Sequence, residues 1–204
     1  STNIATLTLA LNDTEETATV TTVGVGTANK MVVTGAGDLT IGTSFTGLQL
    51  DASDSTGIMS VQLVNTIATD IKGGSGNDIF TTDATAAAYT IDGGAGVDTL
   101  VGTIAADDYS ALALSLTNIE KLDMTAVDAF DIFSGAQMTG KDYLVVGDGT
   151  IDGINVTALS STGEVIDLAD FTTSIASLTL TGLAGGDTLT GSSVSATIIN
   201  AAAG

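Results

Sequence analysis

Cysteine, proline, histidine, arginine and tryptophan are absent from this chain of 204 residues, and three tyrosines and five phenylalanines are its only aromatic residues. Without cysteine there can be no disulfide and no thiolate metal site. Without histidine or cysteine there can be no Ser–His or Cys–His catalytic pair. Carboxylate-only glycoside chemistry needs neither, but sugar sites usually offer stacking aromatic rings. We therefore expect that the chain is not an enzyme.

Positive charge is almost absent as well. Four basic residues stand against 24 acidic ones, which gives a formal net charge of −20. This charge excludes a phosphate-binding surface, so nucleic acid is not expected as a partner, and it disfavours binding to anionic lipid. Acidic groups repel one another in a compact state, which suits a protein that takes up divalent cations. Because 44% of the residues are hydrophobic, the chain is not a disordered acidic tail.

No apolar run reaches the roughly 18 residues that a membrane-spanning helix needs, so we expect no membrane insertion. The N-terminus has neither a starting methionine nor a signal-peptide core, and the C-terminus stops just after a predicted strand. We expect residues 1–204 to be one continuous segment of a longer protein.

Short alternating segments separated by polar or glycine-rich turns dominate the chain, as residues 4–11 illustrate. Such strands fit a sandwich or a solenoid, but the self-similar turns, the lack of proline and the many Thr, Ala and Ser residues favour the solenoid. The predicted fold is an all-β, right-handed parallel β-helix or β-roll. We expect a polar turn at 51–57 and short helical turns at 84–88 and within 126–139.

Two nonapeptides, residues 73–81 and 93–101, fit the pattern G-G-x-G-x-D-x-U-x, in which U is a large apolar residue. The glycines permit tight turns and leave carbonyl oxygens accessible, and Asp78 or Asp98 adds a carboxylate. Calcium prefers six to eight such oxygens. Phe80 and Leu100, at position eight, should point into a core. Because Asp98 follows Asp78 by 98 − 78 = 20 residues, the two turns should stack one coil apart.

These matches resemble the RTX family of calcium-binding β-rolls. Strict matches cover 18 of 204 residues; residues 182–190 fit less well, and residues 35–41 keep only part of the pattern. The resemblance implies that a calcium ion lies between turns and is held by backbone carbonyls and by the position-six carboxylates. Carried over to this sequence, the implied ligands are Gly73, Ser75 and Asp78 facing Gly94, Gly96 and Asp98, with further candidates at Gly182, Ala184, Asp187 and Asp38.

Other acidic residues allow two interpretations each. Asp92 either joins the calcium site or ends its strand, and Asp38 is more simply a turn residue. Asp187 would need a stacking partner beyond residue 204, because 187 + 18 = 205. Asp51, Asp123 and Asp167 share a strand-closing context that favours Asx-turns, in which the carboxylate accepts a nearby backbone N–H.

The sparse, drifting repeats resemble the calcium-dependent surface-layer proteins of bacteria. This resemblance implies a secreted structural protein at the cell surface that is exported unfolded through a one-step channel, folds in external calcium and self-associates into a lattice. Contact with cell-surface polysaccharide would involve parts outside residues 1–204. Two alternatives stay open: a stalk or ligand-binding segment of a large RTX adhesin, and the C-terminal roll of an extracellular hydrolase.

Overall fold

The computed structural model describes residues 5–23, 30–63, 69–82, 88–102, 108–125, 130–147, 153–158, 163–170, 172–173, 177–183, 185–192 and 197–200. The chain divides into two compact units. The first comprises Ser1–Val101 with Ala113–Ile119, and the second comprises Gly102–Leu112 with Glu120–Gly204. Among the described residues, no helix has the length and apolar character to cross a membrane.

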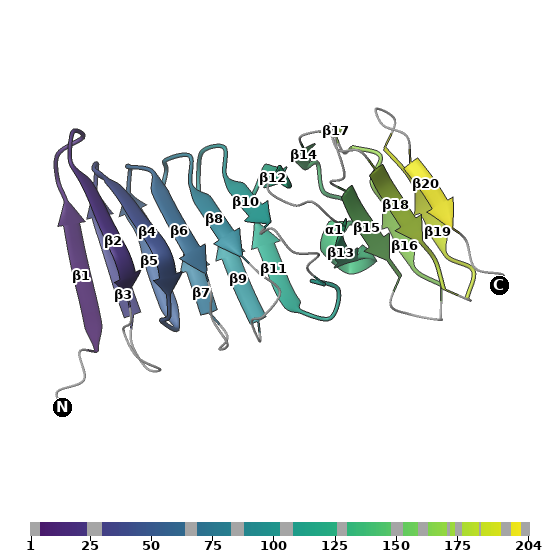
Figure 1. The fold of residues 1–204 in the computed structure, drawn as a ribbon, viewed down its shortest axis with the longest axis horizontal. Helices are drawn as coiled ribbons and strands as arrows, with labels where there is room; N and C mark the ends of the chain where they lie inside the picture. Colours follow the sequence, from purple (N-terminus) through teal and green to yellow (C-terminus); the bar gives the residue numbers. More distant parts are fainter. Residues whose placement is uncertain are drawn as a thin grey trace. The chain divides into compact units, whose positions relative to one another are not determined.

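The first unit is a stack of short strands that run parallel to their neighbours (Figure 1). Each strand pairs with the strand that comes two later in the chain, so one coil of the chain lies on the next. Its strands are β1 (Thr6–Leu11), β2 (Thr17–Val23), β3 (Lys30–Gly35), β4 (Asp38–Phe45), β5 (Gln49–Ser55), β6 (Met59–Leu63), β7 (Thr69–Lys72), β8 (Ile79–Thr82), β9 (Ala88–Asp92), β10 (Thr99–Gly102) and β11 (Ala113–Thr117).

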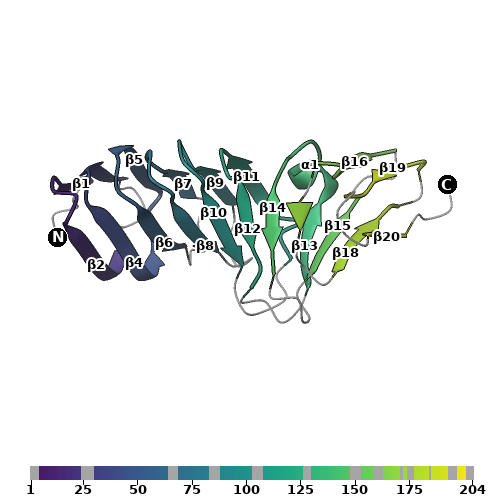
Figure 2. The same cartoon turned by 90° about the horizontal axis from the view of Figure 1, so that it is seen from above.

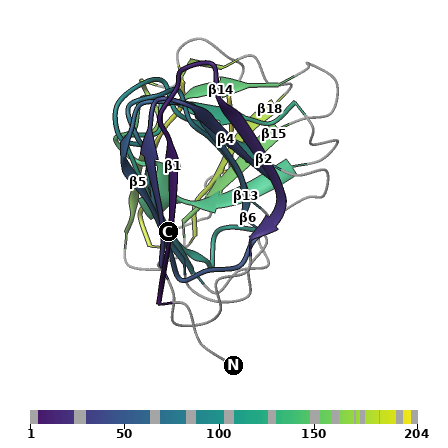
Figure 3. The same ribbon diagram turned by 90° about the vertical axis from the view of Figure 1, so that its left-hand side faces the viewer.

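These strands form two sheets that face each other. The odd-numbered strands are ordered β1-β3-β5-β7-β9-β11 and the even-numbered ones β10-β8-β6-β4-β2. Viewed from above, β5, β7 and β9 lie on one side and β4, β6 and β8 on the other (Figure 2). In the end view β1 and β5 are separated from β2, β4 and β6 (Figure 3). The prediction of an all-β parallel solenoid is confirmed.

The core consists of columns of apolar side chains at equivalent positions in successive coils. In the odd-numbered sheet, Met31, Leu50, Ile71 and Ile91 are in register, and all are buried. Burial of an aliphatic side chain contributes about 1.5–3 kcal/mol. Because successive strand residues point to opposite faces, the residues between these positions form equally regular columns on the outside.

The second unit also consists mainly of parallel strands. One sheet has the order β13-β15-β18-β20, β16 pairs with β19, and β12 pairs with β14, which pairs with β17. The helix α1 (Gly135–Met138) begins at a capping box formed by Ser134 and Gln137. The strands are β12 (Lys121–Asp123), β13 (Phe130–Ser134), β14 (Leu144–Val146), β15 (Gly153–Thr157), β16 (Val165–Asp167), β17 (Thr172–Thr173), β18 (Ser177–Thr181), β19 (Thr188–Thr190) and β20 (Thr197–Asn200).

The local expectations had mixed outcomes. The polar turn predicted at 51–57 is wrong, because β5 continues to Ser55 through a bulge that accommodates one extra residue opposite β3. Within 126–139, residues 126–129 lie outside the described part; of residues 130–139 only Gly135–Met138 are helical, since β13 occupies Phe130–Ser134. Of the helical turn predicted at 84–88, residues 84–87 lie outside the described part, and Ala88 begins β9.

Glycine is required at one edge of the first unit, where the backbones of successive turns touch. A Cβ atom on Gly57 would lie 2.1 Å from the carbonyl oxygen of Gly37, and one on Gly76 would lie 2.5 Å from that of Gly57. Gly96 continues this column, with a Cβ position 2.3 Å from the oxygen of Gly76. Any side chain here would force neighbouring coils apart and lengthen their hydrogen bonds.

We therefore predict that Gly57→Ala lowers the free energy of unfolding by roughly 1–3 kcal/mol, measured by urea denaturation. Gly42→Ala is the matched control, because a Cβ at Gly42 has nothing within 4 Å. The control should change stability by no more than about 0.5 kcal/mol. Equal effects of the two substitutions would contradict the close stacking of the turns.

Candidate functional site

The two aspartates of the strict nonapeptides occupy core-facing positions. Leu39, Met59 and Asp78 are equivalent residues of successive coils, since Leu39 pairs with Met59 and the next residue, Ser60, pairs with Ile79. Asp98 stands one coil beyond Asp78, and neither carboxylate side chain is exposed. Position eight lies two residues further along the strand and so points the same way. The prediction that Phe80 and Leu100 enter the core is confirmed, since they are 0% and 1% exposed.

The carboxylate of Asp78 connects its own turn to the preceding coil. Its Oδ2 accepts the backbone N–H of Gly74 at 2.8 Å, and its Oδ1 accepts that of Met59 at 2.8 Å. Burial raises the pKa of Asp78 above its usual 3.8, although these two N–H donors act in the opposite direction. Asp78 therefore holds a buried turn together while carrying a charge that its environment disfavours.

Asp98 repeats the contact with the preceding coil. Its Oδ1 accepts the backbone N–H of Asp78 at 2.7 Å, and the N–H of Thr99 donates to the Asp78 carbonyl at 2.8 Å. Asn77 connects the turns in the opposite direction, since its Oδ1 accepts the N–H of Val97 at 2.9 Å. The predicted stacking of the two turns, one coil apart on one edge, is confirmed.

The other implied ligands lie in the same pair of turns. Gly94 and Gly96 have φ angles of +98° and +130°, which favour glycine strongly. The N–H of Gly73 donates to the backbone carbonyl of Asp92, and the N–H of Ser75 donates to the backbone carbonyl of Ser55. The carbonyl of Gly74 accepts the N–H of Ala95 at 2.9 Å. This bond engages one of the two acceptor sites of the Gly74 carbonyl.

Asp92 ends strand β9 and contacts the next coil. Its Oδ1 accepts the N–H of Gly94 at 3.3 Å and the side-chain amide of Asn118 at 2.8 Å. Asn118 follows Gly93 in a column of turn residues and has a φ of +50°, a conformation that asparagine tolerates better than most residues. Both contacts are those expected of a strand-ending residue.

The donor chemistry of these turns fits a hard cation. Two carboxylates lie one coil apart beside backbone carbonyls, and the candidate set contains oxygen atoms only, as calcium prefers. A carboxylate can accept about four hydrogen bonds or metal contacts, so its bonds to N–H groups leave capacity. In the described part of the chain, no three acidic side chains converge. Gly73, Ser75, Gly94 and Gly96 would therefore contribute most ligands through their carbonyls, together with the two aspartates.

The looser match at 182–190 has the same geometry, with a partner that sequence analysis missed. Asp187 accepts the N–H of Leu183 at 2.6 Å and that of Glu164, in the preceding coil, at 2.8 Å. The N–H of Thr188 donates to the Glu164 carbonyl at 2.8 Å. Glu164 therefore occupies the position in the preceding coil that Asp78 occupies relative to Asp98. Gly182 lies beside the Asp187 carboxylate, and Ala184 is outside the described residues.

The sequence does not reveal Glu164 as this partner, because Asp187 follows it by 23 residues instead of the 18 of two nonapeptides. Its short segment Thr162-Gly163-Glu164 also lacks the other pattern glycines. The expected partner beyond residue 204 is therefore not needed for stacking.

Asp38 lies one residue before the strand position that is equivalent to the two buried aspartates. It precedes Leu39, whereas Asp78 is equivalent to Leu39 and Met59. Its Oδ1 accepts the N–H of Ile58 at 2.8 Å, which is the role that Asn77 plays toward the next coil. Asp38 thus connects two coils in the manner of Asn77.

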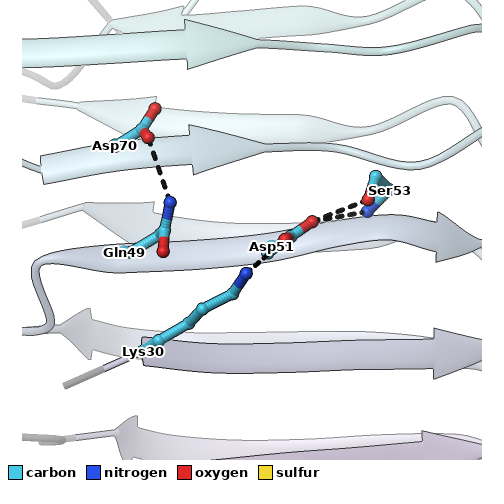
Figure 4. A network of polar contacts seen from close by, with 5 residues as sticks. All are labelled: Lys30, Gln49, Asp51, Ser53 and Asp70. Atoms are coloured by element: carbon cyan, nitrogen blue, oxygen red, sulfur yellow. Dashed lines mark hydrogen bonds and ion pairs between the residues drawn. The ribbon is translucent and has the colours of Figure 1, made fainter. Parts of the chain in front are cut away.

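The predicted Asx-turns at Asp51, Asp123 and Asp167 are confirmed by hydrogen bonds from the N–H two residues ahead. The Asp51 carboxylate also pairs with Lys30 at 2.5 Å, and nearby Gln49 donates to Asp70 at 3.2 Å (Figure 4). This contact with Lys30 lowers the pKa of Asp51 to about 2.

We predict that Asp78→Ala lowers the free energy of unfolding by roughly 2–5 kcal/mol, because it leaves two buried N–H groups without their acceptor. Asp54→Ala removes the same charge from an exposed position and should change stability by less than about 0.5 kcal/mol. Thermal or urea denaturation without metal measures both. Similar losses in the two variants would mean that Asp78 does not secure the turn.

Two aspartates should affect the pH dependence of stability in opposite ways. The folded state raises the pKa of Asp78, so protonation of Asp78 stabilises the fold; this contribution is full below pH 3.8 and is lost as pH rises through the raised value. For Asp51 the contribution is present above pH 3.8 and is lost as pH falls toward 2.

Urea denaturation between pH 2.5 and 7 tests this prediction. Relative to Asp78→Asn, the wild type should gain stability as pH falls. Relative to Asp51→Asn, it should lose stability below about pH 4. Parallel pH profiles for the wild type and both variants would refute the assignment.

Comparison of the chain with protein-family models, with curated proteins and with solved structures gave no match in any of the three. The parallel solenoid and the stacked acidic turns are therefore the basis for a functional proposal.

Proposed function

We propose that this chain is a structural, calcium-binding segment of a bacterial surface layer, and that calcium orders its acidic turns and promotes self-association. The observation that carries the proposal is the stacking of Asp78 and Asp98, two buried carboxylates, in turns rich in backbone oxygen. A cation between such turns would offset a charge that burial disfavours.

The charge balance supports this role. At −20 the chain has few internal cations to neutralise its acids. Lys30 and Lys121 pair with Asp51 and Asp123, so two of the four basic residues are already engaged with outward-facing acids. A divalent ion with an all-oxygen site would lower the electrostatic repulsion where the chain's own lysines do not.

The architecture supports a structural rather than a catalytic role. A parallel solenoid offers long, regular faces, and its stability is close to a sum of contacts between neighbouring coils. One surface hollow is lined by Asn12, Asp13, Thr14, Glu15 and Glu16, an open acidic loop. Such a scaffold suits an extracellular lattice, in which extent and regularity matter more than a deep pocket.

We expect calcium to raise the melting temperature of the purified chain, and EGTA to reverse the increase, because metal binding to the folded turns shifts the folding equilibrium. Far-UV circular dichroism and thermal melts measure this effect. Magnesium should substitute poorly, since it demands a rigid octahedral site and loses water reluctantly. Melting curves that are identical in calcium and EGTA would count against the proposal.

Asp78→Asn and Asp98→Asn should weaken one shared site. Titration calorimetry should show that the double variant loses less calcium affinity than the sum of the two single losses. Asp54→Asn, at an exposed position, is the matched control and should bind like the wild type. Strictly additive losses would indicate two independent sites.

A further inference from the structure

The outer face of the odd-numbered sheet carries charges of both signs at equivalent positions of successive coils. Outward positions on β3, β5, β7 and β9 form two columns. Along each strand, one column precedes and the other follows the buried residue, which is Met31, Leu50, Ile71 or Ile91. One column is Lys30, Gln49, Asp70 and Thr90, and the other is Val32, Asp51, Lys72 and Asp92. We name these eight residues the two-column face.

Most polar groups of the two-column face are already engaged within the chain. Lys30 and Ser53 bind Asp51, Gln49 binds Asp70 at 3.2 Å, and Asn118 binds Asp92 at 2.8 Å. Lys72 differs. It is exposed and makes no ion pair with any residue that the structure describes, although Asp51 and Asp92 occupy equivalent positions in the coils on either side.

From this pattern we propose that the two-column face binds a second copy of the chain about a twofold axis that lies in the interface, parallel to the direction of coil stacking. Such an axis keeps each coil opposite its equivalent and exchanges the two columns. Lys72 then lies opposite Asp70 of the second copy, and Asp70 opposite Lys72. Because the contact is isologous, this pair occurs twice.

The other coils agree with the same axis. It places Gln49 opposite Asp51 and Thr90 opposite Asp92, so each of the three acids meets a hydrogen-bond donor. In the remaining coil, Lys30 lies opposite Val32. No acid faces another acid.

A twofold axis parallel to the strands and centred on β7 fits poorly. It would place Lys72 opposite Lys72 and Asp70 opposite Asp70 of the second copy, and like charges in contact disfavour a complex. With the β7 strands of the two copies opposite each other, charge complementarity therefore favours antiparallel packing of the strands across the interface. This inference rests on the proposed role in self-association and specifies the surface that the copies use.

The test is a charge swap at Asp70 and Lys72 in the full 204-residue chain. Lys72→Asp would place two acids opposite each other, and Asp70→Lys two lysines, so each variant should weaken self-association by at least about tenfold in Kd. The double variant Asp70→Lys/Lys72→Asp restores opposite charges and should associate within about threefold of the wild type. Sedimentation equilibrium at low ionic strength, with and without calcium, measures these constants.

A mixture of the two single variants tests the predicted charge pairing directly. An equimolar mixture of Lys72→Asp and Asp70→Lys should form heterodimers more tightly than either variant forms homodimers. Asp170→Lys makes the same change in net charge at an exposed position outside the face and should not reproduce the effect of Asp70→Lys. Circular dichroism confirms that each variant is folded.

Several outcomes would overturn the inference: a wild type that stays monomeric, a Lys72→Asp variant that associates like the wild type, or a mixture with no preference for heterodimers. The proposed calcium role is tested separately by the melting curves. A calcium-stabilised chain whose association ignores the charge swap would reject only this interface. A charge swap that behaves as expected in a chain that calcium does not stabilise would reject only the calcium role.

Discussion

Parallel hydrogen bonding between one coil and the next is the constraint on which this structure depends. It fixes the spacing of neighbouring strands at about 4.8 Å, so the closest neighbours of each residue on the same face are the equivalent residues of the coils on either side. An apolar column such as Met31, Leu50 and Ile71 then becomes a continuous core. Any residue type that recurs with the coil period is amplified into a column, whether it is apolar, small or charged.

The same constraint explains why the turn aspartates are buried. Asp78 and Asp98 are in the same inward column as Leu39 and Met59, and they accept backbone N–H groups at the starts of the strands. A carboxylate can satisfy such donors, but it brings a charge into a place that water does not reach. The folded turn therefore gains stability from whatever neutralises that charge, a proton or a cation.

On the outer faces, stacking in columns turns single charges into patterns. Lys30 and Asp51 come from adjacent coils and pair because the register brings them together. Lys72 stands between two acids of its column yet remains exposed and unpaired among the described residues. On a chain with four basic residues, an exposed lysine of this kind can contact an acidic group of another molecule, as in the proposed interface.

The sequence by itself determined the class of fold, the stacked turns at residues 73–101 and the Asx-turns, because these depend on local periodicity and on the conformational freedom of glycine. Phe80 and Leu100 could be assigned to the core by counting alone. The bulge at β5 was missed, since a polar stretch such as Asp51–Ser55 reads as a turn unless its neighbours in space are known.

Only the tertiary structure decided which residues from different coils meet. The backbone N–H of Glu164 donates to the carboxylate of Asp187, 23 residues later, and Asp38 is equivalent to Asn77 rather than to Asp78. Because the coils differ in length, a fixed repeat length cannot predict which residues of neighbouring coils are equivalent. The order of charges across β3, β5, β7 and β9 was equally hidden, because it depends on a register that backbone hydrogen bonds set over the whole stack.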